Sequence, residues 1–62
     1  MEIKYGFKYR CGHNPWTYMV VSVVNDDIHL CIEYDDGRQS RHTIATRKFI
    51  EMGFKIGVYK AV

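Results

Sequence analysis

Residues 16–37 have the sequence WTYMVVSVVNDDIHLCIEYDDG, which contains two predicted strands and two turns. Residues 16–24 are aromatic and β-branched, which is typical of a strand. Residues 25–27, Asn-Asp-Asp, indicate a tight hairpin turn, because Asn and Asp favour turn conformations. After this turn, apolar residues alternate with His29, Cys31 and Glu33, so a second strand with one buried face is predicted. The inward residues are Ile28, Leu30, Ile32 and Tyr34.

Two further strands are predicted on either side of this stretch. Upstream, an alternation with period two over residues 3–10 predicts a half-buried strand, which the Asn14-Pro15 turn ends. The apolar members of that alternation are Ile3, Tyr5, Phe7 and Tyr9. Downstream, a last strand is predicted over residues 54–59, with Phe54, Ile56 and Val58 on one side and Lys55 and Tyr59 on the other.

The segment between these strands, residues 38–52, is compatible with two structures. A fourth strand over residues 39–45, with Ile44 inward and a short helical turn near 47–52, gives a mostly β, five-stranded SH3-like barrel. Alternatively, Thr43 caps a helix over 43–52 that ends at a C-cap glycine, Gly53. The fold would then be α+β, with a three-stranded antiparallel sheet, a helix and a C-terminal strand.

The stretch 16–37 resembles Tudor-like small barrels, which often have an aromatic entry, a V-V-S-V strand and a strand ending in Y-D-D-G. The resemblance covers about a third of the chain and favours the barrel. It implies binding of methylated Lys or Arg in an aromatic cage, of nucleic acid, or of protein. The candidate cage residues are Trp16, Tyr18, Tyr34 and Asp36. The usual aromatic beside the Asp-x-Gly turn is missing, which weakens the methylated-peptide hypothesis, because cation–π recognition uses several ring faces.

Length and composition indicate a single small globular domain. The chain has 62 residues, of which 47% are hydrophobic and 15% aromatic. It has no apolar run near the ~20 residues that span a membrane, and no signal-peptide core at its start. Two cysteines are too few for a disulfide framework, so we expect a cytoplasmic protein with reduced thiols. An initial Met and the absence of a tag suggest a complete small protein of phage type.

The charges are segregated along the chain. Residues 1–37 contain three basic and six acidic residues, whereas residues 38–62 contain six basic residues and only Glu51 as an acid. This asymmetry predicts a basic face that meets nucleic acid or an acidic protein surface, although a merely solvated surface would have the same composition. The candidate contact residues are Arg38, Arg41, Arg47, Lys48, Lys55 and the stacking aromatic Tyr59.

The sequence contains no set of residues that indicates catalysis. Cys11, His13, His29 and Cys31 could in principle bind zinc, but their spacing fits no standard module, so no metal or cofactor is predicted. Cys11 and His13 lack a third group that would orient them as nucleophile and base. We therefore expect a non-enzymatic binding module, with nucleic acid as the leading partner. The alternative is a small interaction protein that inhibits a host or defence protein; a methylated-peptide reader comes third, and no membrane partner is expected.

Overall fold

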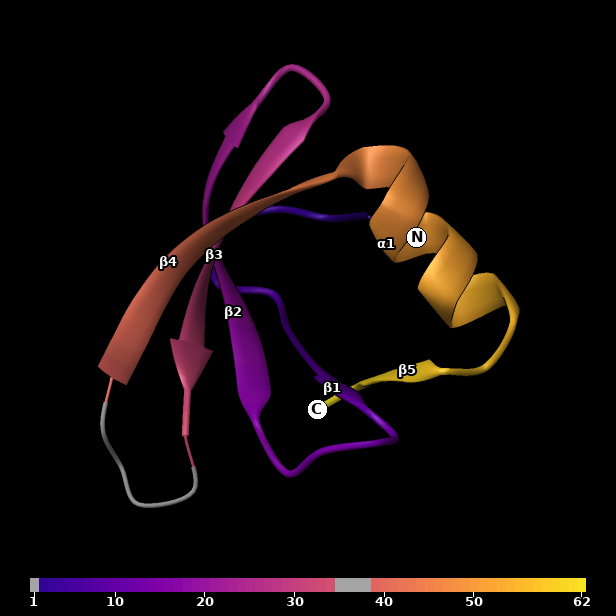
Figure 1. Ribbon diagram of the computed structural model, residues 1–62. Helices are drawn as coiled ribbons and strands as arrows, with labels where there is room; N and C mark the ends of the chain where they lie inside the picture. The colour runs from indigo at the N-terminus through magenta and orange to yellow at the C-terminus, as the bar shows by residue number, and fades with distance from the viewer. Residues whose placement is uncertain (1, 35–38) are drawn as a thin grey trace.

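The computed structural model describes residues 2–34 and 39–62, which form five strands and one helix (Figure 1). In chain order these are β1 (Lys8–Cys11), β2 (Thr17–Val24), β3 (Asp27–Glu33), β4 (Gln39–Thr46), α1 (Arg47–Lys55) and β5 (Tyr59–Ala61). Within the described residues, no helix is long and apolar enough to cross a membrane.

The strands form one antiparallel sheet in the order β4-β3-β2-β1-β5. Strands β1 to β4 follow one another as a meander, and β5 returns to pair with β1, with Tyr9 opposite Ala61. The helix α1 connects β4 to β5, the two end strands of the sheet (Figure 1). The prediction of a mostly β fold with five strands and a short helical segment is thus confirmed as an open five-stranded sheet with one helix. The alternative fold is wrong, because Thr43 lies within β4 and the helix begins only at Arg47.

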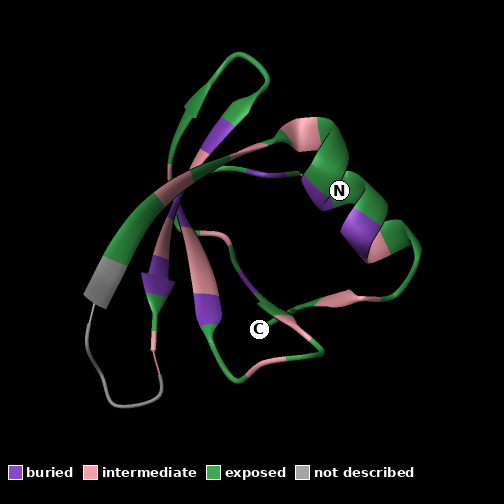
Figure 2. Ribbon diagram, viewed as in Figure 1, coloured by how far each residue is buried: buried purple, intermediate pink, exposed green. Residues whose placement is uncertain are grey.

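The core lies between the concave side of the sheet and α1 (Figure 2). Each central strand contributes alternate side chains, and α1 contributes Ile50, which is completely buried. Since a fully buried Ile stabilises a fold by roughly 1.5–3 kcal/mol, Ile50 is the main contact that holds α1 on the sheet. The other buried apolar residues of this cluster are Ile3, Tyr9, Val20, Ile28 and Leu30.

Local capping determines where α1 begins and ends. Thr46 has an extended backbone, and its hydroxyl accepts a hydrogen bond of 3.2 Å from the Phe49 N–H, so Thr46 and not Thr43 is the N-cap. At the other end, the Gly57 N–H donates to Phe54 O (3.2 Å) and the Val58 N–H to Gly53 O (2.9 Å), with Gly57 at φ +84°. This is a Schellman motif, which glycine favours because it adopts positive φ without strain. The prediction of Gly53 as the C-cap glycine is therefore wrong, since the C-cap residue is Ile56 and the glycine that follows it is Gly57.

Three predictions about the strands are also corrected. Residues 4–7 form a turn closed by a 3.0 Å bond from Phe7 N to Lys4 O, with Gly6 at φ +88°, so β1 begins at Lys8 and Tyr5 is 74% exposed. Residues 54–58 belong to the end of α1 and its cap, so β5 begins at Tyr59. Ile44 points outward at 54% exposure, because Ala45 is the residue that lies opposite the buried Ile28.

Candidate functional site

The structure separates the basic residues that the sequence grouped together. Lys48 and Lys55 are exposed on α1, seven residues apart, which places them on the same side of the helix about 10 Å apart along its axis. Arg47 is only half exposed. Arg41 is exposed on β4, five residues before that strand ends, or about 16 Å away along the strand. Arg38 lies outside the described residues. The helix therefore brings together Lys48 and Lys55, and leaves Arg41 apart from them.

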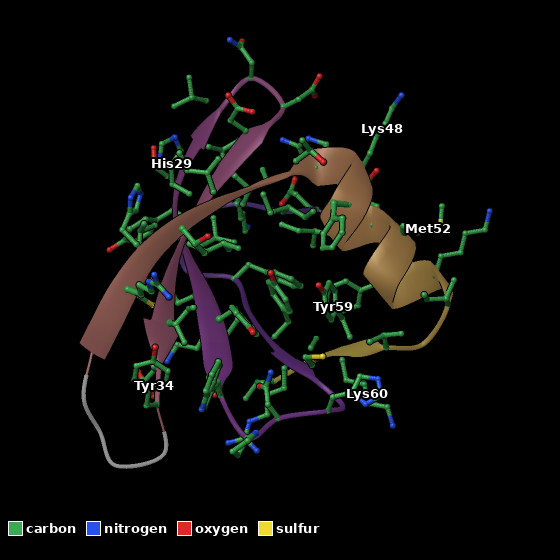
Figure 3. All side chains as sticks on the ribbon, in the orientation of Figure 1. His29, Tyr34, Lys48, Met52, Tyr59 and Lys60 are labelled. Atoms are coloured by element: carbon green, nitrogen blue, oxygen red, sulfur yellow. The ribbon has the colours of Figure 1, made fainter. Side chains whose placement is uncertain are left out.

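Tyr59, predicted as a stacking residue, packs inside the molecule. Its ring lies between α1 and the sheet (Figure 3), with ring centroids 4.9 Å from Tyr9 and 5.9 Å from Phe54. Burial raises the pKa of the Tyr59 hydroxyl, and the neighbouring Cys11 and Tyr18 add to this effect. One side of the ring is covered by Gly53, where any Cβ would overlap it. Tyr59 thus has a packing role in this fold, with only part of its ring left for a ligand.

Two of the four candidate cage residues come together. Trp16 and Tyr34 are in edge-to-face contact, with ring centroids 4.8 Å apart and planes at 79°, and Trp16 is 36% exposed. Tyr18 instead stacks on the buried Tyr9 at 5.2 Å, and its hydroxyl oxygen is 3.5 Å from Asn14 Nδ2. Asp36 lies outside the described residues. The arrangement supplies two aromatic walls at one end of the sheet.

An apolar stripe on α1 is the feature that the sequence analysis missed. It consists of Phe49, Met52 and the C-cap residue Ile56, which are 63%, 54% and 64% exposed. Their spacing of i, i+3 and i+7 places them within one narrow arc of the helix, because each residue advances about 100°. Ile50 and Phe54 occupy the opposite side, which faces the core, and the buried Gly53 lies between the two sides. A helical period of 3.6 residues reveals the stripe once the helix is known to cover residues 47–55. The stripe was missed because Ile56 was assigned to a predicted final strand over residues 54–59.

A groove runs beside this stripe. It has a volume of about 160 Å³ and is almost entirely apolar, bounded by the stripe together with Gly53, Val58 and Tyr59. On the other side of the stripe, Lys48 and Lys55 are the i−4 and i+3 neighbours of Met52, so their ammonium groups border it. Met52 and Lys48 both point away from the body of the molecule (Figure 3). The helix therefore presents an apolar surface with a cationic border.

A pair of histidines lies on the convex side of the sheet. The Nδ1 atom of His29 on β3 is 3.0 Å from the Nε2 atom of His42 on β4, and the two rings are stacked at 5.1 Å. Cys31 is directly opposite His42 in the strand register. Within residues 2–34 and 39–62, however, no three His, Cys, Asp or Glu residues are placed to hold a metal ion. His29 and His42 thus form a hydrogen-bonded cross-strand pair.

One acidic residue, Glu51, is exposed on α1 itself, three residues after Lys48 and four before Lys55. Asp26 and Asp27 are exposed at the β2–β3 hairpin, and Asp35 lies outside the described residues. Both cysteines are free thiols on different strands, Cys11 on β1 and Cys31 on β3, and both are half-buried.

Comparisons of this chain with known protein families, with curated proteins and with solved structures find no match. The functional argument therefore rests on the geometry of the chain itself, and the apolar stripe with its groove is the strongest candidate site.

Proposed function

We propose that this chain is a non-enzymatic binding module that recognises a protein partner through the apolar stripe of α1 and the groove beside it. The observation that carries the proposal is the exposure of Phe49 and Met52 on α1 and of its C-cap residue Ile56, all on one side. Single exposed apolar side chains are ordinary, but a contiguous patch beside a groove is typical of an interaction surface.

The size of the domain strengthens this reasoning. A chain of 62 residues has few large apolar side chains with which to build a core. Nine of those in the described residues are nevertheless exposed, and Phe49, Met52 and Ile56 are three that lie together. Burying each one under a partner would contribute up to about 1.5–3 kcal/mol. Such residues, clustered around one pocket, are the usual energetic centre of an interface.

The surroundings of the stripe define the chemistry of the partner. Lys48 and Lys55 border it, and within the described part of the chain no carboxylate lies within salt-bridge distance of either. A partner segment with an apolar side chain for the groove and carboxylates facing the two lysines would fit both features. Opposite charges at the border would increase the association rate and set the orientation of binding. A module of this size could act as an inhibitor by covering a functional surface of a larger protein.

The scaffold is consistent with this role. The strand order β5-β1-β2-β3-β4, with the helix between β4 and β5, supports a barrel-like architecture of the SH3 type, in which binding is a common use of the scaffold. We also propose that the chain catalyses no reaction, because its candidate nucleophile Cys11 and base His13 have no orienting third group.

Nucleic-acid binding is the second candidate. It is favoured by the exposed Lys48 and Lys55 on α1 and by the exposed Arg41 on the preceding strand β4. Binding by these residues would be electrostatic, so it would weaken steeply as salt increases. A mobility shift of mixed oligonucleotides at low and high salt separates this candidate from protein binding, which depends on apolar contact.

The test of the main proposal is capture of a partner by variants of the intact protein. Phe49→Ser/Met52→Ser removes most of the stripe, whereas Tyr5→Ser/Val24→Ser removes a similar apolar area elsewhere, since Tyr5 and Val24 are also exposed. We expect nuclease-treated lysate of the source cells to yield a protein captured by the wild type and by the Tyr5/Val24 variant. The Phe49/Met52 variant should capture at least tenfold less of it. Equal capture by both variants would refute the proposal.

A further inference from the structure

A second set of cations, distant in sequence, meets on the convex side of β1 and β5. Arg10 on β1 lies directly opposite Lys60 on β5, and Lys8 is two residues before Arg10 and hence on the same side of its strand. All three are exposed, whereas Tyr9 between them is buried on the core side. We call these three residues, Lys8, Arg10 and Lys60, the β1–β5 basic face.

This arrangement is unfavourable for the isolated protein. Side chains directly opposite each other on antiparallel strands have Cβ atoms about 4.5–5.5 Å apart, and like charges there are destabilising. Among the described residues, no carboxylate is within salt-bridge distance of the β1–β5 basic face. The nearest acid in the same cross-strand row, Glu33, is two strands beyond Arg10, or about 10 Å away. An anion between Arg10 and Lys60 would remove this repulsion.

The site also has a shape and an oriented donor. A hollow of about 300 Å³ is lined by Arg10, Cys11, Gly12, Asn14, Lys60, Ala61 and Val62. The Nε–H of Arg10 donates a hydrogen bond of 3.3 Å to the hydroxyl of Thr17, which is buried. That bond fixes the guanidinium plane while leaving its two terminal nitrogens for a ligand. A planar fork of this kind binds two oxygens of one phosphate at once.

We propose that the β1–β5 basic face binds a phosphate group. The terminal nitrogens of Arg10 would hold two of its oxygens, and the Lys60 ammonium would supply the second charge. Lys8 is about 7 Å from Arg10 along the strand, so it could contact a neighbouring phosphate of a phosphodiester chain. The phosphate could belong to a nucleic-acid backbone or to a free phosphate group.

This proposal is independent of the protein-binding function. Lys60 projects from β5 on the side away from α1 (Figure 3), and none of the three cations belongs to the apolar stripe. Because the two surfaces are separate, the failure of one proposal leaves the other in place. Variants of each surface can therefore serve as controls for the other.

The experiment compares two double variants that remove the same charge. Arg10→Gln/Lys60→Gln changes the β1–β5 basic face, and Lys48→Gln/Lys55→Gln changes the cationic border of α1. The probes are inorganic phosphate and a decamer of thymidine without terminal phosphates, measured by NMR chemical shifts and fluorescence anisotropy. We expect Arg10→Gln/Lys60→Gln to lower the affinity for the bound probe at least tenfold, and Lys48→Gln/Lys55→Gln to lower it less than threefold.

The two probes distinguish the sources of the phosphate. Binding of inorganic phosphate that is lost in Arg10→Gln/Lys60→Gln supports a site for a free phosphate group. Binding of the decamer alone supports a backbone site, and its salt slope should then fall by roughly 0.7 for each of the two charges removed. Absence of binding by either probe at low salt, or equal losses in the two double variants, would overturn the proposal. Far-UV circular dichroism checks that each variant is folded.

Discussion

Gly53, in the last turn of α1, is in contact with Tyr59, the first residue of β5, and this contact explains why a glycine occupies that helical position. A Cβ at position 53 would lie 2.9 Å from Tyr59 Cγ and closer still to other ring atoms. The ring cannot easily move away, because Tyr9 and Phe54 pack against it. The sequence pattern alone indicated a C-cap at Gly53, because it contained no information about the ring that packs there.

Gly53→Ala should therefore destabilise the protein, although Ala is the better helix former by about 1 kcal/mol. Overpacking costs about 1–3 kcal/mol. Because the obstacle here is a packed ring, we expect a cost of about 2–3 kcal/mol, and hence a net loss of about 1–2 kcal/mol in the free energy of unfolding. Urea denaturation measures it, with the exposed Glu51→Ala as a control that should stay within about 0.5 kcal/mol. In a Tyr59→Ala background the loss should disappear. A stabilising effect of Gly53→Ala in the wild-type background would show that the ring is free to move.

The buried tyrosines also predict how stability depends on pH. Burial is the main cause that raises the pKa of Tyr9 and of Tyr59 above the ordinary value of 10.0. The unfolded chain would then lose these protons at lower pH than the folded chain, so stability is unaffected below pH 10 and falls as pH rises above it.

Urea midpoints at pH 8, 10 and 11 test this expectation. Tyr9→Phe should reduce the loss of stability at alkaline pH, because it removes the most strongly shifted hydroxyl. Tyr5→Phe is the matched control, since Tyr5 is largely exposed and should leave the loss unchanged. An identical pH dependence in the Tyr9 variant would contradict a role for its burial.

At the level of secondary structure, the sequence predicted best the strands whose alternation is supported by neighbouring strands. In β3, Ile28, Leu30 and Ile32 all face the core as expected, because β2 and β4 flank that strand on both sides. The alternation of residues 3–7 looked equally regular, but a turn at Gly6 interrupts it. Ile44 and Ala45 exchanged their expected sides, since the hairpin register, which the sequence does not show, determines which residue lies opposite Ile28.

Only the alternative fold misplaced the start of α1, at Thr43, whereas the predicted helical turn near 47–52 begins where α1 begins. Thr46 is the last residue of β4, and its hydroxyl accepts the Phe49 N–H, so Thr46→Ala should lower stability by about 1 kcal/mol. Thr46→Ser keeps the hydroxyl and should cost only a few tenths of that value. Thermal or urea unfolding measures both variants, and equal losses from Ala and Ser would show that the methyl group, and not the hydroxyl, matters at this position.

For the whole molecule, the charge asymmetry along the sequence did not translate into one basic face. The fold places Lys48 and Lys55 on α1 and Arg41 near the start of β4. Arg10 and Lys60 lie opposite each other on β1 and β5. The latter pair is fifty residues apart in the chain, so only the return of β5 to β1 brings it together. Of the candidate cage residues, Trp16 and Tyr34 are in contact, whereas Tyr18 stacks on the buried Tyr9.

The apolar stripe was hidden for a related reason. A large apolar residue is usually expected in the core of a protein. Only the orientation of α1 on the sheet shows that Phe49, Met52 and Ile56 face water. The orientation follows from Ile50 and Gly53, which are the residues of the helix that can approach the sheet. The function proposed for this protein therefore depends on how α1 is docked.

Site-specific photo-crosslinking tests the central claim, that a protein partner contacts the apolar stripe, most directly. A photoreactive phenylalanine analogue replaces Met52 in one protein and Val24, which is similarly exposed on β2, in another. After irradiation in nuclease-treated lysate, we expect the analogue at position 52 to form one dominant protein adduct that Phe49→Ser/Ile56→Ser suppresses at least tenfold. The analogue at position 24 should form none. Adducts of equal yield at both positions, or no protein adduct at position 52, would contradict the account.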